Sequence, residues 1–298
     1  MRLAVYREKS TAGNVPGALE LLRRRALAAA EAGEGVAIFP EMFLTGAELI
    51  AVPTALIRPF GIVARTLVEK IMAEIQVDVK LSGIWQMTST VIRSGASCLV
   101  VDPGYFPREI ADLVGLVPKE ARVEALLFTH SHWDHVVGHG VFPPVPVYTS
   151  SVLACSVAEG GELAVNGMAK AREFDSRWYI ERPWGYKWPQ DLRGLDDGGW
   201  FNVSDLDIEA FLIPGHAPDC MAIRAENHLL VGDYLSPCEI PFVDNLADYR
   251  RTLKRLLSLI SPAVDTVVPG HGPALSAADA CRIAREDLRY LDGIARCA

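Results

Sequence analysis

From about residue 77 onward, short apolar runs bounded by turn residues alternate with longer segments whose apolar residues recur at helical spacing. The short runs are typical of buried strands, and the longer segments of helices that pack on a sheet. This mixture favours an α+β or α/β fold. It predicts helices that begin at Pro107, span 246–260 and follow Ser276. It predicts strands at 90–93, 97–102, 125–128, 208–213, 221–225, 228–232 and 265–268.

The first quarter of the chain has a different pattern. Residues 1–50 suit a strand, a helix and a second strand, and residues 56–76 suit an amphipathic helix. We therefore expect a βαβ segment at 1–50, a helical connector at 51–76 and a larger domain at 77–298. A βαβ segment of this size cannot bury a core alone. It is expected to pack on the rest of the chain or on a second subunit, which would make a homodimer.

Composition and charge narrow the class of protein. Half of the residues are hydrophobic, so the chain is globular, and its net charge of −8 disfavours a nucleic-acid partner. The six cysteines form no Cys-x-x-Cys pair and suit reduced thiols of a cytoplasmic protein. No apolar stretch reaches membrane-spanning length and no secretory leader is evident, so no membrane partner is expected.

The densest chemical signal is the run His130-Ser131-His132-Trp133-Asp134-His135. It places four potential metal ligands within six residues, directly after a predicted strand. Imidazoles this close would repel one another if they were protonated, and a divalent metal ion resolves that conflict. Three more strand ends carry a candidate ligand, namely His216, Asp233 and His271.

These four groups resemble the motifs of the metallo-β-lactamase superfamily, and the resemblance covers residues 77–298. The matching groups are His130-x-His132-x-Asp134-His135, Gly215-His216-Ala217-Pro218-Asp219, Val231-Gly232-Asp233 and Pro269-Gly270-His271-Gly272. The resemblance implies a four-layer αβ/βα sandwich, preceded here by the extra N-terminal βαβ segment. It also implies a binuclear metal centre. One ion would be held by His130, His132 and His216, the other by Asp134, His135 and His271, with Asp233 bridging both and Asp102 supporting the ligands from behind.

The resemblance further implies a hydrolase that uses a metal-bound hydroxide on a small ester, thioester or lactone. Asp134 would orient the water and move a proton. Zinc suits the nitrogen and oxygen ligands best, with iron or manganese as alternatives. Two other interpretations remain open from the sequence. One is a mononuclear iron dioxygenase acting on persulfides, and the other is a non-enzymatic metal-binding module.

An aromatic-rich insertion at about 170–200 separates the first ligand group from the second. We expect it to wall the active site and to suit a semi-polar organic anion. The alternative is a loop that packs its own aromatic side chains over the sheet. The candidate substrate-shaping residues are Trp178, Tyr179, Arg182, Trp184, Lys187 and Trp188.

Residues 1–50 resemble the opening unit of the nitrilase, or carbon–nitrogen hydrolase, superfamily. The resemblance rests on Phe39-Pro40-Glu41-Met42-Phe43-Leu44-Thr45-Gly46, in which Glu41 takes the place of the family's catalytic glutamate. That family also needs a lysine and a nucleophilic cysteine on later strands, and no later motif supplies them. The segment is therefore expected to be a truncated, non-catalytic fragment.

Overall fold

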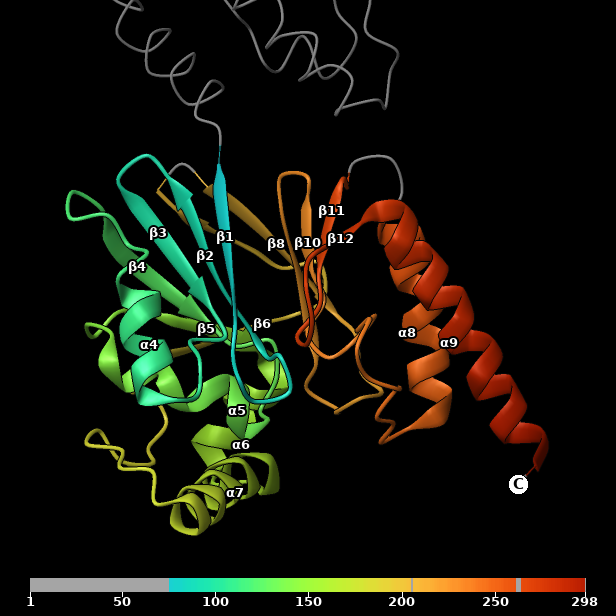
Figure 1. Cartoon of the computed structure of the whole chain (residues 1–298), viewed down its shortest axis with the longest axis horizontal. Helices are drawn as coiled ribbons and strands as arrows, with labels where there is room; N and C mark the ends of the chain where they lie inside the picture. The colour runs from blue at the N-terminus through green and yellow to red at the C-terminus, as the bar shows by residue number, and fades with distance from the viewer. Residues whose placement is uncertain (1–74, 205, 261–263, 298) are drawn as a thin grey trace, which may run out of the picture. The chain divides into compact units, whose positions relative to one another are not determined.

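Two six-stranded sheets face each other in the computed structural model, which describes residues 75–204, 206–260 and 264–297 (Figure 1). In the first sheet the strand order is β1 (Gln76–Leu81), β2 (Thr88–Ser94), β3 (Ser97–Val101), β4 (Arg122–Leu127), β5 (Val147–Ser150) and β6 (Leu192–Leu195). In the second it is β12 (Leu275–Ser276), β11 (Thr266–Val268), β10 (His228–Leu230), β9 (Met221–Ala225), β8 (Leu206–Leu212) and β7 (Trp200–Val203).

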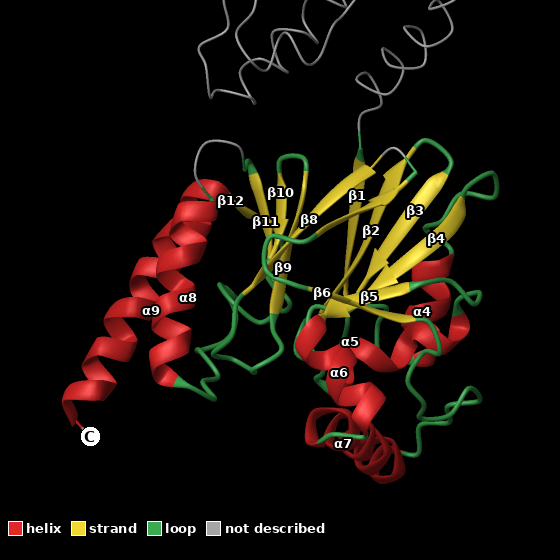
Figure 2. Cartoon of the chain, turned by 180° about the vertical axis from the view of Figure 1, so that it is seen from behind, coloured by secondary structure: helices red, strands yellow, loops and turns green. Residues whose placement is uncertain are grey.

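Helices cover the outer face of each sheet (Figure 2). The first sheet carries α4 (Pro107–Val114), α5 (Trp133–Val136), the 3-10 helix η2 (Val137–Val141), α6 (Ser151–Glu159) and α7 (Glu162–Trp178). The second carries α8 (Leu246–Leu259) and α9 (Ala277–Cys297), which lie side by side. Among the helices that the structure describes, none is both long and apolar enough to cross a bilayer.

Three apolar cores separate these four layers. The core between the sheets includes Leu99, Leu127 and Ile208, while separate cores join each sheet to its own helices. Because β3 is covered on both faces, all five of its residues are buried, as its unbroken apolar run predicts. The αβ/βα sandwich expected from the sequence is thus confirmed for the described residues. The expected βαβ segment at 1–50, including Glu41, lies outside them.

The sequence pattern placed about half of the described elements and gave no prediction for β1, β5, β6, β7, β12 or the helices between Trp133 and Trp178. The hairpin of β2 and β3, the hairpin of β9 and β10, and helix α8 agree with the predicted positions within a few residues. Residues 170–200, expected as an insertion, begin inside α7, which continues to Trp178, and later contain β6. This stretch is therefore part of the layered domain, since its helix and strand pack on the first sheet.

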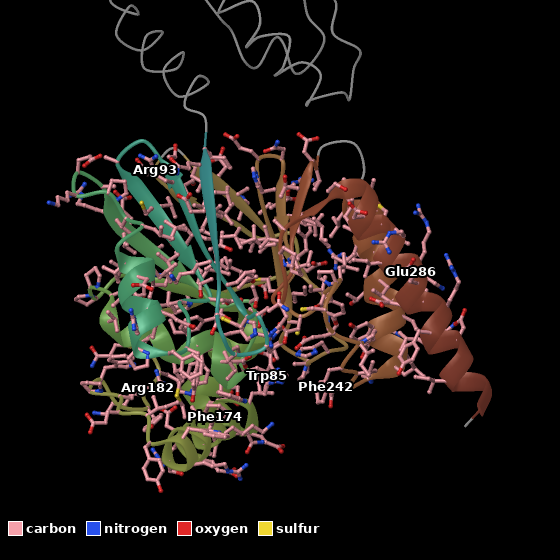
Figure 3. The ribbon with its side chains drawn as sticks, viewed as in Figure 1. Trp85, Arg93, Phe174, Arg182, Phe242 and Glu286 are labelled. Atoms are coloured by element: carbon pink, nitrogen blue, oxygen red, sulfur yellow. The ribbon has the colours of Figure 1, made fainter. Side chains whose placement is uncertain are left out.

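The strand directions explain why the candidate ligands meet. In the second sheet β8 and β10 both run antiparallel to β9, and β11 runs parallel to β10. The carboxyl ends of β8, β10 and β11 therefore reach the same edge, and they deliver His216, Asp233 and His271 there. The end of β4 delivers the run that begins at His130. Figure 3 shows Trp85 and Phe242 at this edge, opposite the edge that carries Arg93.

Candidate metal centre

Two compact clusters of metal-binding side chains lie at this edge. The first contains His130, His132, His216 and Asp233, and the second contains Asp134, His135 and His271. Within each cluster the potential ligand atoms lie within 4.8 Å of one another. The structure thus brings together all seven residues that the sequence motifs singled out. They include five of the seven histidines in the chain.

Asp233 stands between the clusters and offers one carboxylate oxygen to each. Its Oδ2 lies 3.1 Å from His216 Nε2 and 3.4 Å from His130 Nε2, both in the first cluster. Its Oδ1 lies 3.1 Å from His135 Nε2 and 3.5 Å from His271 Nε2, both in the second. A carboxylate placed in this way can bridge two cations.

The residues fit a pair of divalent ions, because several buried polar atoms have no other partner. His130 Nε2, His135 Nε2 and Asp233 Oδ1 are buried and accept or donate no hydrogen bond among the described residues. Buried polar atoms are nearly always satisfied in folded proteins. Imidazole nitrogens and carboxylate oxygens in this arrangement form the mixed donor set that zinc, iron and manganese accept.

The outward-facing ring nitrogens of three histidines are fixed by hydrogen bonds. His216 Nδ1 lies 3.0 Å from the carbonyl of Phe242, and His271 Nδ1 lies 3.0 Å from the carbonyl of Trp85. His135 Nδ1 lies 2.9 Å from Asp102 Oδ2. Such contacts hold the proton on Nδ1 and leave the Nε2 lone pair facing the other ligands.

Asp102 reaches both clusters from behind. Its Oδ1 accepts from the Thr129 amide at 2.8 Å, and its Oδ2 accepts from the Thr129 hydroxyl at 2.7 Å. The same hydroxyl lies 3.1 Å from His130 Nδ1. A carboxylate only accepts hydrogen bonds, so His135 must carry its proton on Nδ1 to donate to Asp102. Because the Thr129 hydroxyl donates to Asp102, its oxygen is left to accept a hydrogen bond from Nδ1 of His130.

The electrostatics of the clusters favour cations. Burial, followed by the nearby imidazoles of His130 and His216, lowers the pKa of His132 to about 2, which keeps this ring neutral as a ligand must be. Burial also disfavours the imidazolium of His271, but hydrogen bonding and the charge of Asp233 outweigh it and raise that pKa to about 9. The field that stabilises a proton there is the field that attracts a metal ion.

A glycine precedes each of the three ligands from the second sheet, and two of these glycines are dictated by close contacts. Gly215 has a φ of +135°, and a Cβ there would overlap the backbone of Tyr249 in α8. A Cβ at Gly270 would overlap Asp233 Oδ1. The backbone can therefore approach the ligands this closely only without a side chain.

A cleft of about 470 Å³ opens beside the first cluster, next to His132 and His216. One wall is a stripe along the first half of α7, in which polar and apolar residues alternate. The rest of the lining comes from the ligand loops and from the segment between β10 and α8. The remaining lining residues are Ser131, Trp133, Glu162, Leu163, Asn166, Gly167, Lys170, Ala217, Pro218, Phe242 and Asp244.

None of the six candidate substrate-shaping residues is among those that line this cleft. Trp178 and Tyr179 are 63% and 92% exposed at the end of α7. Trp184 and Trp188 use their ring N–H groups to cap the carbonyls of Val137 and Ala164, behind the cleft. Lys187 is exposed away from the lining residues.

Arg182 is taken up by a buried ion pair. Its Nε lies 2.7 Å from Asp175 Oδ2, and both side chains are almost fully buried. The guanidinium stacks over Tyr105 and Trp184, and Tyr105 and Tyr186 donate hydrogen bonds to the same carboxylate. The charge of Arg182 is therefore used inside the protein, and Figure 3 places it on the α7 side of the domain.

The sequence motifs did not indicate the α7 wall of the cleft. Glu162, Asn166 and Lys170 recur at four-residue steps, but a polar stripe with that spacing is also what any solvated helix face shows. Phe242, 68% exposed on an irregular segment, carried no motif either. Its carbonyl contact with His216 and its ring contacts with His132 and His216 place it beside the first cluster.

Comparison with known proteins identifies the family. A family model described as the metallo-beta-lactamase superfamily matches residues 83–271. The chain therefore belongs to the metallo-β-lactamase superfamily. That match supports the resemblance seen in the ligand motifs. Nothing in these comparisons supports the nitrilase resemblance of residues 1–50.

The similar curated proteins act in several settings. A probable polyketide biosynthesis zinc-dependent hydrolase, BaeB of Bacillus velezensis, is 28% identical over 183 residues, which cover 60% of this chain and 69% of that protein. A hydroxyacylglutathione hydrolase of Aeromonas hydrophila is 27% identical over 57% of this chain and 55% of its own length. An atrochrysone carboxyl ACP thioesterase, AgnL7 of Paecilomyces divaricatus, is 26% identical over 62% of this chain and 52% of its own length.

Solved structures agree on the fold. An archaeal metallo-beta-lactamase superfamily protein from Sulfolobus tokodaii superposes with a TM-score of 0.55 at 19% identity, over 73% of this chain and 86% of that one. The protein TTHA1623, solved in a di-iron-bound form, gives a TM-score of 0.50 at 25% identity, over 69% of this chain and 98% of that one.

Proposed function

We propose that this chain is a metal-dependent hydrolase of small acyl compounds, with a thioester as the favoured substrate and an ester or lactone as alternatives. The observation that carries this proposal is the position of Asp233, whose two oxygens face two complete clusters of ligands. The relatives named as thioesterase and as hydroxyacylglutathione hydrolase support the choice of a thioester.

In this proposal each cluster would hold one divalent ion, and Asp233 would be a ligand to both. His130 and His216 would bind through Nε2, because their Nδ1 atoms are engaged behind them. His132 would bind through Nδ1, the atom that lies 2.9 Å from His216 Nε2. When bound, such ions polarise a carbonyl oxygen and lower the pKa of water towards about 7.

The protein's own contribution is to position and to move a proton. Asp134 is buried at the start of α5, and its Oδ2 lies 3.6 Å from both His135 Nε2 and His271 Nε2. A carboxylate at this point can orient a water molecule and accept its proton. Trp133 and Phe242 line the cleft and would exclude bulk water from the acyl group.

A reconstitution experiment tests the proposal. The metal-stripped chain is loaded with zinc, iron or manganese, its metal content is measured, and hydrolysis is followed on matched thioester, ester and lactone probes. We expect two ions per chain and turnover that falls more than about 100-fold in His132→Ala and Asp134→Ala. His228→Ala, which changes a histidine outside both clusters, is the control and should keep full activity.

Two results would overturn the proposal. Wild-type activity in either ligand variant would show that the clusters are not the catalytic site. One iron per chain, with oxygen uptake on a persulfide and no hydrolysis of any probe, would instead support the dioxygenase alternative.

A further inference from the structure

The charges along the cleft are unevenly placed with respect to the first ligand cluster. α7 packs against the ligand loop at Gly167, where an added Cβ would lie 2.7 Å from the carbonyl oxygen of Ser131. At 1.5 Å of rise per residue, Lys170 lies roughly 4.5 Å along the helix from this contact, and Glu162 roughly 7.5 Å in the other direction. Both side chains line the cleft, and the backbone of Lys170 is the nearer of the two to this contact.

Lys170 is also free to bind a ligand. No described carboxylate pairs with it, whereas the more distant Glu162 accepts a hydrogen bond from Asn166 at 3.3 Å. The second carboxylate of the cleft belongs to Asp244, on the facing segment beside Phe242. A substrate anion would gain from Lys170 and would be repelled by Asp244, so its preferred place is along α7.

The lining also contains large apolar side chains. They belong to Trp133, Leu163, Pro218 and Phe242. Such a surface suits a short hydrocarbon segment, and a cleft that is apolar with a few placed polar groups is typical of small-molecule sites.

We propose that Lys170 is a specificity-determining residue that binds an anionic group at the far end of the acyl substrate. The substrate class is then an acyl thioester or ester with an apolar linker between its scissile carbonyl and a terminal carboxylate or similar anion. This inference rests on the proposed hydrolase function. It adds a subsite to the cleft that the ligand motifs do not describe.

The test uses two probes that differ only in charge. They are the N-acetylcysteamine thioesters of glutaric acid and of its isosteric monoamide, together with their non-hydrolysable thioether analogues. Dissociation constants of the thioethers are measured by calorimetry on the zinc-loaded full chain, and kcat and KM are measured on the thioesters. The variants are Lys170→Gln, Lys170→Arg and Asp244→Asn. Lys187→Gln removes a lysine outside the cleft and is the matched control.

We expect Lys170→Gln to weaken binding of the carboxylate thioether by about two- to fivefold, the range of a solvent-exposed ion pair, without affecting the amide. Lys170→Arg should retain the preference, and Asp244→Asn should strengthen it, because a repulsive charge is lost. The preference should shrink in high salt. Lys187→Gln should behave as wild type.

The outcomes separate the two proposals. If Lys170→Gln changes both thioethers equally, or neither, the anion subsite is wrong. If the zinc-loaded wild type binds the carboxylate thioether in a manner that depends on Lys170 but hydrolyses neither thioester, the subsite stands and thioester hydrolysis is wrong.

Discussion

Asp102 Oδ2 lies 2.9 Å from His135 Nδ1, and this contact decides which nitrogen of His135 faces the other ligands. The same carboxylate also acts on His130 of the other cluster, through the hydroxyl of Thr129. One acceptor therefore sets the proton positions of two histidines that belong to different clusters.

Replacing Asp102 should weaken the binding of both metal ions. In Asp102→Asn the side chain keeps its shape, but an amide N–H facing His135 Nδ1 would force the proton onto Nε2, the nitrogen needed for metal binding. We expect metal affinity to fall by about 10- to 100-fold in Asp102→Asn and Asp102→Ala. Competition with a chromogenic chelator measures this for each ion. Asp112→Asn, on the exposed side of α4, is the control, and an unchanged affinity in Asp102→Asn would contradict the tautomer argument.

Gly270→Ala should disturb the centre without replacing a ligand. A methyl group at this position overlaps Asp233 Oδ1, so either the carboxylate or the strand end must shift. We expect loss of metal affinity of at least about tenfold, similar to loss of a supporting contact. Gly293→Ala is the matched control, because a Cβ there meets nothing within 4 Å in the helix α9. It should stabilise the protein by about 0.5–1 kcal/mol and leave metal binding unchanged. Retention of full affinity in Gly270→Ala would show that the site tolerates the shift.

Arg182→Met should change stability rather than substrate recognition. The substitution leaves Asp175 buried without its cation, which we expect to cost about 3–5 kcal/mol in the free energy of unfolding. Urea denaturation measures this cost, and KM on a confirmed substrate should stay at the wild-type value. Arg193→Met breaks an exposed pair with Asp191 and should cost less than about 1 kcal/mol. A raised KM in Arg182→Met at full stability would restore Arg182 as a substrate-shaping residue.

Asp287 should make stability depend on pH. Burial, and then the charge of Glu286, raise the pKa of Asp287 from 3.8 to about 6 in the folded chain. Well below pH 3.8 the group is protonated in both states and costs nothing, whereas above pH 6 the folded state must hold it charged, so stability falls across this range. Asp287→Asn removes that cost. We expect its urea midpoint to equal the wild-type value at about pH 3 and to exceed it at about pH 7.5, and an equal gain at both pH values would show a packing effect instead.

The candidate ligands could be predicted from the sequence because they lie in short sequence motifs. His130, His132, Asp134 and His135 are neighbours in the chain, and His216 and His271 each follow a glycine at a strand end. Strand ends that share one edge must bring such residues together, whatever the length of chain between them. The layered fold could also be predicted from local patterns, since buried strands such as β3 have unbroken apolar runs.

The residues that surround the candidate ligands were harder to predict from the sequence, because their positions depend on which face each helix turns toward the sheet. The sequence shows Arg182 among aromatic residues but does not show that Asp175, seven positions earlier on α7, turns inward to meet it. It shows Lys170 on a polar stripe but not that Gly167 brings this stripe against Ser131. Charge and aromaticity alone thus did not indicate which residues line the cleft.

The close approach at Gly167 has an evolutionary consequence. α6 and α7 lie in the long stretch between His135 and His216, which contributes no ligand. This helical pair can therefore be exchanged, lengthened or grafted from a relative without moving any residue of the two clusters, provided that a glycine is kept where the helix meets the ligand loop. The α7 wall of the cleft can thus diverge while the two clusters of candidate ligands are held constant.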